Sequence, residues 1–277
     1  LPEVQDVADI SGDSLELARK AKETDCDVIV FCGVRFMAET AHILNPDKTV
    51  VMPDPQAGCP LADMVDVQTL RKLKSDNPGS MVVCYVNSTA EVKAESDVVC
   101  TSANAVKVVQ ALDTDKPIIF VPDQHLGNYV RRVTGRDLVL APGFCPTHRH
   151  VMSDDIREMK RNMPDAVVIV HPECADDVID IADFVCSTSQ MMTAVKDSPD
   201  AKKFIIGTEV GMLHRLRNEF PGREFFVPSN RCVCPNMKKT NLEKVLWELD
   251  SLEHEIVLDP DIRQKALGAL ERMLQYV

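Results

Sequence analysis

GFCPTH, residues 143–148, is the stretch that decides the fold of this sequence. It follows the strand-like run 137–141 and precedes a polar, helix-like stretch. Its Cys-Pro dipeptide occurs also at Cys59-Pro60 and Cys234-Pro235 and nowhere else in the chain. The cysteines of the three pairs, Cys59, Cys145 and Cys234, stand 86 and 89 residues apart. Near-equal spacing of a rare dipeptide indicates an internal repeat.

A second marker recurs at the same period. Asp9, Asp97 and Asp183 are 88 and 86 residues apart, and each follows a small residue. Five residues after each aspartate comes a hydroxyl residue: Ser14, Ser102 and Thr188. Twelve and ten residues before the second and third aspartates come polar residues at the ends of apolar runs: Tyr85 and Asn87, then His171 and Glu173. For the first aspartate these positions fall before Leu1, so we expect the opening strand of the first repeat to be missing from this sequence.

Each repeat reads as an alternation of short strands and helices. Strands are predicted at 81–86 and 166–170, at 27–33, 117–121 and 203–207, and at 48–52, 137–141 and 223–227. Helices are predicted at 14–22, 102–112 and 188–195, at 36–44, 125–134 and 210–219, at 66–75, 153–162 and 240–251, and at 261–275. In each repeat the Asp-x-x-x-x-Ser/Thr stretch is expected to be a turn that opens a helix. Such alternation predicts parallel sheets with helices on their faces.

The predicted architecture is therefore α/β, with three small parallel-sheet domains about a pseudo-threefold axis. The expected domains are 1–78, which the C-terminal tail 253–277 joins, then 79–164 and 165–252. Ligands of parallel α/β units gather at the carboxyl ends of the strands. The shared markers all lie at that edge, so we expect the three edges to surround one central site.

Composition narrows the classes of protein. The chain has 277 residues, is 45% hydrophobic, and carries 31 basic against 43 acidic side chains, for a net charge of −12. This balance, without any basic block, argues against a nucleic-acid binder. No apolar run is long enough to span a membrane, and no signal-peptide pattern is present. Ten cysteines in such a chain are expected to be reduced thiols, which predicts a cytoplasmic protein.

The three Cys-Pro pairs predict a metal site. Proline suits the first position of a helix, and the positive end of a helix stabilises a thiolate. Three converging thiolates do not complete a structural zinc site, whose cysteines usually come in close pairs. An iron–sulfur cluster bound by three cysteines leaves one iron open as a Lewis acid, and the long spacing favours this interpretation. Cys232 is an alternative, spare ligand.

Each candidate also has a purely structural interpretation. Cysteine is often a buried packing residue, and we apply this interpretation to the remaining thiols: Cys26, Cys32, Cys84, Cys100, Cys174 and Cys186. The three hydroxyls would suit helix caps, and Tyr85 and His171 would suit satisfied buried polar groups. His148, three residues after Cys145, is either a residue behind the site or a surface residue.

Helix N-termini and hydroxyls attract anions without any lysine or arginine. The site is therefore expected to bind small carboxylates and phosphates, although the protein carries net negative charge.

Several motifs together resemble the quinolinate synthase A protein family of NAD biosynthesis (pyridine nucleotide biosynthesis). They are Gly12-Asp-Ser-Leu, Phe36-Met-Ala-Glu, Leu44-Asn-Pro-Asp-Lys, Tyr85-Val-Asn-Ser-Thr-Ala-Glu, Cys100-Thr-Ser-Ala-Asn-Ala-Val, Gly143-x-Cys-x-x-His, Val170-His-Pro-Glu-Cys, Gly207-Thr-Glu-x-Gly-Met and Asn236-Met-Lys. The resemblance covers essentially the whole chain. It implies a [4Fe-4S] transferase that condenses iminoaspartate with dihydroxyacetone phosphate to quinolinate, phosphate and water. It also implies an upstream aspartate oxidase or dehydrogenase as the supplier of iminoaspartate.

The resemblance assigns roles by position. It implies three cluster ligands, Cys59, Cys145 and Cys234, and three hydroxyls that hold substrate carboxylate or phosphate, Ser14, Ser102 and Thr188. It implies two binding segments, Tyr85-Val86-Asn87 and His171-Pro172-Glu173. Glu173 is the expected proton shuttle, helped by Tyr85 and His171.

The sequence also departs from the family pattern. The family's opening strand ends in His-Asn-Tyr, which this sequence does not contain. Ser189 replaces a usual glycine, and Phe144 replaces a common histidine.

Three other classes stay open at this point. Two are three-lobed iron–sulfur enzymes, the isoprenoid diphosphate reductase and the diphthamide-forming radical enzymes, whose motifs we do not find. The third is a non-enzymatic iron–sulfur sensor or carrier, which would need no polar residues around an open iron.

Overall fold

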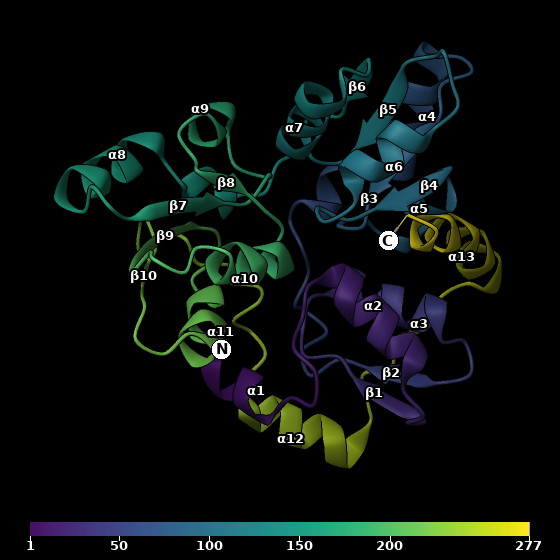
Figure 1. Cartoon of the computed structure of the whole chain (residues 1–277). Helices are drawn as coiled ribbons and strands as arrows, with labels where there is room; N and C mark the ends of the chain where they lie inside the picture. Colours follow the sequence, from purple (N-terminus) through teal and green to yellow (C-terminus); the bar gives the residue numbers. More distant parts are fainter. Residues whose placement is uncertain (277) are drawn as a thin grey trace. The chain divides into compact units, whose positions relative to one another are not determined.

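The structure, a computed structural model, describes residues 1–276, and its architecture is α/β (Figure 1). The chain divides into two compact units. One comprises residues 145–234, and the other comprises residues 3–144 together with the C-terminal segment from 235 onward. Three small sheets are present and all their strand pairs are parallel. The predicted α/β class with three parallel sheets is therefore confirmed, whereas the domain boundaries stay a prediction.

The first sheet has two strands, β1 (Val28–Val30) and β2 (Thr49–Val51). The helices α2 (Ser14–Glu23) and α3 (Arg35–Leu44) pack against each other, and α3 also packs on β2. Both helices are amphipathic, and the apolar sides of α2 and α3 enter a core that also holds Phe31. These elements are followed by η1 (Ala62–Met64) and α4 (Val67–Asp76).

The C-terminal tail returns to this first sheet. Glu255 pairs with Val51 as an isolated antiparallel bridge, and the Ile256 N–H donates to the Val50 carbonyl at 2.8 Å. Ile256 is buried and Leu258 packs against the same core as α2 and α3. The tail thereby covers apolar surface of the first sheet.

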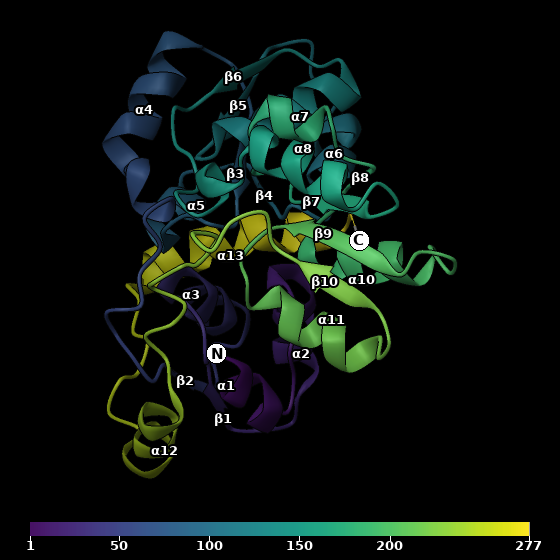
Figure 2. The same ribbon diagram turned by 90° about the vertical axis from the view of Figure 1, so that its left-hand side faces the viewer.

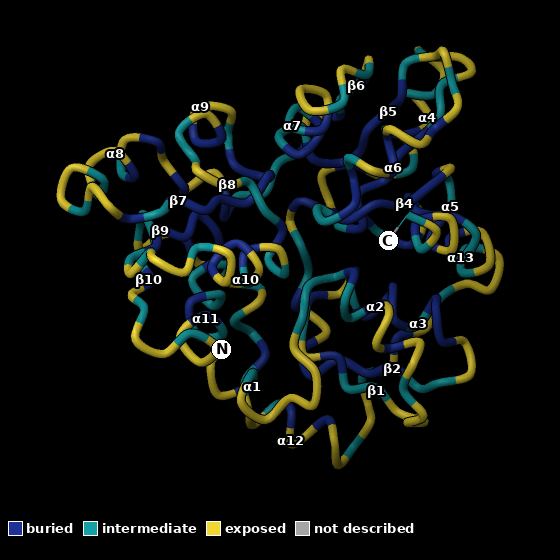
Figure 3. Tube along the Cα trace, viewed as in Figure 1, coloured by how far each residue is buried: buried dark blue, intermediate teal, exposed yellow. Residues whose placement is uncertain are grey.

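The second sheet has the strand order β4-β3-β5-β6. Its elements are β3 (Val82–Tyr85), α5 (Ala90–Ala94), β4 (Val98–Cys100), α6 (Ala105–Ala111), β5 (Ile118–Val121), α7 (Gln124–Thr134) and β6 (Leu138–Leu140). All residues of β3, β4 and β5 are buried, as Figure 3 shows by their dark blue trace. This burial is what a parallel sheet covered on both faces requires.

The third sheet, in residues 145–234, repeats this order as β8-β7-β9-β10. Its elements are η2 (His148–His150), α8 (Ser153–Asn162), β7 (Val167–Val170), α9 (Asp176–Ile179), β8 (Phe184–Val185), α10 (Thr188–Lys196), β9 (Lys203–Gly207), α11 (Met212–Glu219) and β10 (Glu224–Phe226). Its core includes Ile169, Phe204 and Leu216.

The helix α12 (Leu242–Ser251) corresponds to the repeat helix predicted at 240–251. In the part of the chain that the structure describes, the helices α1 (Pro2–Val7) and α13 (Pro260–Leu274) lie outside the repeat pattern. Asp259 caps α13 by accepting from the N–H groups of Asp261 and Ile262, and Pro260 occupies the first helical position. The helix α13 packs on α5, β4 and α3, and Figures 1 and 2 both show it beside α5. Among residues 1–276, no helix combines the length and the apolar content that a membrane span needs.

The repeated aspartates have the same structural role in the second and third sheets. The Asp97 carboxylate accepts from the Val82 N–H at 2.7 Å, and the Asp183 carboxylate accepts from the Val168 N–H at 2.8 Å. In return, the aspartate N–H groups donate to the carbonyls of Val82 and Val168. The sequence marker therefore corresponds to a reciprocal link that fixes the start of the central strand.

The predicted turn between each aspartate and its hydroxyl residue is partly wrong. In the second and third repeats this stretch contains the strands β4 and β8, which pair with β3 and β7. The helix predicted at 102–112 begins only at Ala105. Asn104 accepts from the Thr101 N–H at 2.8 Å, and this contact holds 101–104 as a turn. The helices α5 and α9 were not predicted.

Candidate active site

The segment His171-Pro172-Glu173 follows β7 directly, at the carboxyl end of the third sheet. The His171 N–H donates to the Gly207 carbonyl at 3.0 Å, so the contact with β9 continues beyond the strand. The Glu173 N–H donates to Nδ1 of His171 at 3.3 Å. Because Nδ1 acts as an acceptor, the neutral His171 ring carries its proton on Nε2. His171 and Glu173 are both buried, and the carboxyl side chain is only 3% exposed.

His148 is the central contact of this segment. Its Nδ1 lies 2.7 Å from a carboxylate oxygen of Glu173, and its Nε2 lies 2.9 Å from the Thr208 hydroxyl. The ring stacks on His171 with centroids 4.6 Å apart and an interplanar angle of 24°. The short Nδ1 contact is not aligned as a hydrogen bond, and no other described group hydrogen-bonds to Nδ1. The interpretation of His148 as a surface residue is wrong, because the residue is buried.

Cys145 is next to these buried groups. Its Sγ, a ring nitrogen of His148 and a carboxylate oxygen of Glu173 all lie within 4.8 Å of one another. The Cys145 carbonyl accepts from the Arg149 N–H at 3.1 Å, which closes the turn that carries His148. The structure thus brings together three residues of the Cys-x-x-His and His-Pro-Glu motifs.

Gly143, at the start of the same stretch, allows a close backbone approach. A Cβ at this position would lie 2.4 Å from the carbonyl oxygen of Pro122. The Gly143 carbonyl accepts from the Gln124 N–H at 2.8 Å. Any side chain at 143 would push the chain away from this contact, so the motif needs glycine here.

Cys234 is held by a carboxylate that sequence reasoning missed. Glu209 accepts from the Cys234 N–H at 3.3 Å with one oxygen and from the Gly211 N–H at 2.7 Å with the other. The Val210 N–H also donates to the carbonyl of Cys232 at 2.8 Å, which joins the two loops. The signal was present in the Gly207-Thr-Glu-x-Gly-Met motif, but nothing in it linked Glu209 to a residue 25 positions away.

Cys59 lies in the loop after β2. Its carbonyl accepts from the Asp63 N–H at 3.2 Å, so Cys-Pro begins the turn that leads into η1. Cys59, Cys145 and Cys234 are all half-buried. The three Cys-Pro thiols therefore occupy loops after the last strand of each repeat.

The other thiols differ in environment. Burial raises the pKa of the Cys84 and Cys100 thiols, and raises the pKa of Cys186 to about 11. Burial likewise raises the pKa of Cys232, and its Sγ lies near the His150 carbonyl. Cys174 is also fully buried. The packing interpretation holds for the buried Cys84, Cys100 and Cys174, and it is wrong for the exposed Cys26. Cys32 is exposed as a residue, yet burial of its thiol raises its pKa to about 11.

The segment Tyr85-Val86-Asn87 is the counterpart of His171-Pro172-Glu173 in the second repeat. Tyr85 and Val86 are buried at the end of β3, and Asn87 is half-buried. The Val86 N–H donates to the Cys100 carbonyl at 2.8 Å, and the Ser88 hydroxyl donates to the Tyr85 carbonyl at 3.0 Å. These contacts fix the backbone of the segment.

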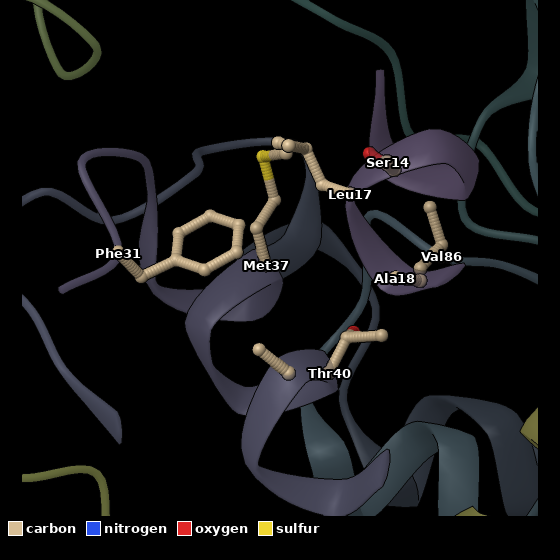
Figure 4. Close-up of a pocket in the computed structure, with 8 residues that line it drawn as sticks. Ser14, Leu17, Ala18, Phe31, Met37, Thr40 and Val86 are labelled. Carbon is tan, nitrogen blue, oxygen red and sulfur yellow. The ribbon is translucent and has the colours of Figure 1, made fainter. Parts of the chain in front are cut away.

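Ser14 and Val86 line one small pocket, although they come from different repeats. Figure 4 shows Ser14 on α2 near Val86, with Leu17, Met37 and Thr40 from α2 and α3 around them. The structure therefore brings together two of the sequence-predicted substrate residues.

The repeated hydroxyl residues do not cap their helices as the structural interpretation expected. Ser14 is the first residue of α2, but Asp13 is the cap, accepting from the N–H groups of Leu15 and Glu16. Thr188 is the first residue of α10, and the cap is Ser187, which forms a capping box with Gln190. The third hydroxyl, Ser102, lies in the turn before α6. The capping interpretation is thus wrong for Ser14 and Thr188.

The chain was compared with known proteins. The family model described as quinolinate synthetase A protein matches residues 1–275. The chain belongs to the quinolinate synthetase A family. A quinolinate synthase of Dehalococcoides mccartyi (strain CBDB1) is 53% identical over 277 residues, covering 100% of this chain and 91% of the relative. The quinolinate synthase of Desulforudis audaxviator is 54% identical over 273 residues, covering 99% and 90%.

A more distant relative gives the same result. The quinolinate synthase of Methanosarcina barkeri is 49% identical over 273 residues, covering 99% of this chain and 89% of the relative. The resemblance inferred from the motifs is therefore confirmed. Membership in the quinolinate synthetase A family also decides against the other three-lobed enzymes and the sensor.

Proposed function

We propose that the protein condenses iminoaspartate with dihydroxyacetone phosphate to give quinolinate, phosphate and water. Glu173 would move the protons, and Cys59, Cys145 and Cys234 would hold a [4Fe-4S] cluster. The observation that carries this proposal is the closeness of the Glu173 carboxylate to Cys145 Sγ, within 4.8 Å. A buried carboxylate beside a predicted cluster ligand has no evident role in a simple carrier protein.

The donor set fits such a cluster. Iron–sulfur clusters bind thiolates, and loop thiols that are half-buried can reach a cofactor while remaining shielded from bulk water. The buried strand thiols Cys84 and Cys100 are held as neutral groups by their raised pKa, so they are poor ligands. When bound, the cluster would supply an open iron that acts as a Lewis acid without a change of redox state.

Glu173 is suited to move a proton because its carboxylate is buried but not isolated. A carboxylate oxygen of Glu173 lies 2.7 Å from Nδ1 of the His148 ring, so the buried carboxylate has a polar neighbour in a site from which water is largely excluded. The condensation requires a proton to leave the substrate nitrogen or carbon and protons to reach the departing oxygens. A carboxylate that alternates between its two forms can perform both transfers.

His171 and Tyr85 would assist by orienting the reacting groups. Because Nδ1 of His171 accepts from the Glu173 N–H, the neutral ring carries its proton on Nε2 and would donate it to a substrate oxygen. We assign Tyr85, Val86 and Asn87 to the binding of one substrate, and His171, Pro172 and Glu173 to the binding of the other.

The hydroxyls are proposed to hold the anionic groups. Ser14 and Thr188 begin helices whose caps are supplied by neighbouring residues, so helix stability does not require either hydroxyl. The first N–H groups of such helices favour carboxylate and phosphate. Together with Ser102 they would position both substrates and so lower the entropic cost of bringing two molecules together.

The test is an assay on anaerobically purified protein. We expect quinolinate to form from iminoaspartate and dihydroxyacetone phosphate, and we expect iron and sulfide to be bound in about equal amounts, about four each per chain. Replacing any one of Cys59, Cys145 and Cys234 by alanine should abolish both turnover and the cluster, while Cys232→Ala should retain both. Turnover in a cluster-free preparation would overturn the assignment of the three ligands.

We further propose a cytoplasmic location, since cluster thiolates must remain reduced. An upstream aspartate oxidase or dehydrogenase would supply iminoaspartate. Direct transfer between the two enzymes would protect this hydrolysis-prone imine, and a coupled assay with the two proteins separated by a membrane tests that step.

A further inference from the structure

A buried polar chain runs from Thr208 through His148 to Glu173. Each of the three side chains is at most one-tenth exposed. The Thr208 hydroxyl is 2.9 Å from Nε2 of His148, and the Glu173 carboxylate is 2.7 Å from Nδ1. Burying polar groups costs free energy unless they have polar partners, so the arrangement needs an explanation.

The chemistry of the partners fixes the roles within this chain. An ionised carboxylate can only accept, so Nδ1 of His148 must carry a proton when Glu173 is charged. In a neutral ring Nε2 is then the acceptor, and the Thr208 hydroxyl donates to it. Which ring nitrogen carries the proton is thus set by both neighbours.

The position of the ring is fixed independently of these contacts. It stacks on His171, whose own Nδ1 is held by the Glu173 N–H. The short turn that begins at Cys145 fixes the backbone of His148. The imidazole is therefore a rigid part of the site, whereas a glutamate side chain has three rotatable bonds and would otherwise sample several rotamers.

We propose that His148 is a positioning residue, which orients the Glu173 carboxylate for proton transfer, with Thr208 fixing the tautomer. This inference rests on the proposed function, in which Glu173 moves the protons. His148 acts only through Glu173, and it does not itself touch the substrate. A polar contact that is not aligned as a hydrogen bond without substrate can tighten when the carboxylate engages its reaction partner.

Two amide variants of His148 test the contacts of its two ring nitrogens one at a time. In His148→Asn the amide nitrogen takes the place of Nδ1 and keeps a donor for Glu173. In His148→Gln the longer side chain places its amide near Nε2 and keeps only the contact with Thr208. We expect His148→Gln to lower kcat about 10- to 100-fold, and His148→Asn to keep kcat within about fivefold of the unmodified protein. KM should change by less than about threefold in both, because substrate binding is not the affected step.

Controls are available in the same turn and in the same chain of contacts. His150 is exposed and lies two residues away, so His150→Gln tests the same substitution outside the site and should leave kcat unchanged. Thr208→Ser keeps the hydroxyl and should retain kcat, whereas Thr208→Val removes it and should lower kcat about three- to tenfold. Iron and sulfide content should be equal in all these variants.

A double-mutant cycle identifies the partner. Glu173→Gln alone is expected to lower kcat about 100-fold or more. If His148 acts through the carboxylate, adding His148→Gln to Glu173→Gln should lower kcat by less than about twofold further. The inference would be overturned if His148→Gln lowered kcat as strongly in the Glu173→Gln background as it does alone. Equal kcat losses in His148→Asn and His148→Gln would also overturn it. An undiminished kcat in Glu173→Gln would instead overturn the proposed function, and with it this inference.

Discussion

The substitution Gly207→Ala tests how closely the two central strands of the third sheet approach each other at their carboxyl ends. Gly207 is the register partner of Val170 on β7. A Cβ at 207 would lie 2.8 Å from Cγ1 and 3.1 Å from Cβ of Val170, and 3.3 Å from Cγ1 of Val151. Ordinary carbon–carbon contacts are about 3.5–4.0 Å, so the new methyl overlaps its neighbours by up to about 1 Å.

The magnitude follows from what can move. Val170 is fully buried and β-branched, so its side chain has little freedom to swing away. Overpacking of this kind costs about 1–3 kcal/mol. Alanine also restricts the unfolded chain, which offsets about 0.4–1 kcal/mol. We therefore expect Gly207→Ala to lower the free energy of unfolding by about 1–2 kcal/mol.

A second substitution sharpens the test. Val170→Ala alone leaves a cavity and is expected to cost about 1–3 kcal/mol. In the double variant the alanine at 207 enters the vacated space, so the two losses should not add. The double variant should lose at least about 1 kcal/mol less free energy of unfolding than the sum of the two single losses. Urea unfolding followed by far-ultraviolet circular dichroism measures these differences. Additive costs would refute the close approach. Gly268→Ala is the control, because the nearest atom to its Cβ would be 3.7 Å away and this mid-helix change should stabilise by up to about 1 kcal/mol.

Two further outcomes follow from the described contacts. Asp97→Ala and Asp183→Ala each leave a buried strand N–H without its acceptor, so each should lower the free energy of unfolding, measured in urea, by about 1.5–3 kcal/mol. The corresponding asparagine variants should lower it by less. An unchanged free energy of unfolding in either alanine variant would contradict the shared role. Because the pKa of Cys186 is raised to about 11, its thiolate fraction rises with pH, so its alkylation by iodoacetamide should accelerate about tenfold per unit between about pH 8 and pH 10. Mass spectrometry with the exposed Cys26 as the reference measures this, and equal labelling of both thiols at about pH 8 would contradict it.

Much of the secondary structure could be predicted because the strands of parallel sheets are short apolar runs. The predicted strand 203–207 coincides with β9, and 166–170 differs from β7 by one residue. The strands β4 and β8 were missed because each lies between the repeated aspartate and its hydroxyl residue, a stretch that was interpreted as a turn opening a helix. Their backbone is extended because they pair with β3 and β7, which local sequence does not reveal.

The residues of the candidate site likewise fall into those that sequence motifs identify and those whose roles depend on the folded structure. Cys145 and Glu173 could be found because each belongs to a repeated or family motif. His148 and Glu209 also stand in family motifs, and His148 was a candidate for a place behind the site. Their roles could not be found, because these depend on side chains far away in the sequence. Thr208 is 60 residues from His148, and Cys234 is 25 residues from Glu209. Spacing rules find residues that share an element or a repeat period, but not partners that meet only after the sheet has formed.

Mössbauer spectroscopy of ⁵⁷Fe-loaded protein tests the central claim most directly, because it distinguishes a cubane cluster from isolated iron. We expect the unmodified protein to show the signature of a [4Fe-4S] cluster with one iron distinct from the other three. Alanine variants of Cys59, Cys145 and Cys234 should each lose this signature, and Cys232→Ala should keep it. A cubane signal that survives the loss of any one of the three thiols, or a signal from a single iron only, would contradict the account.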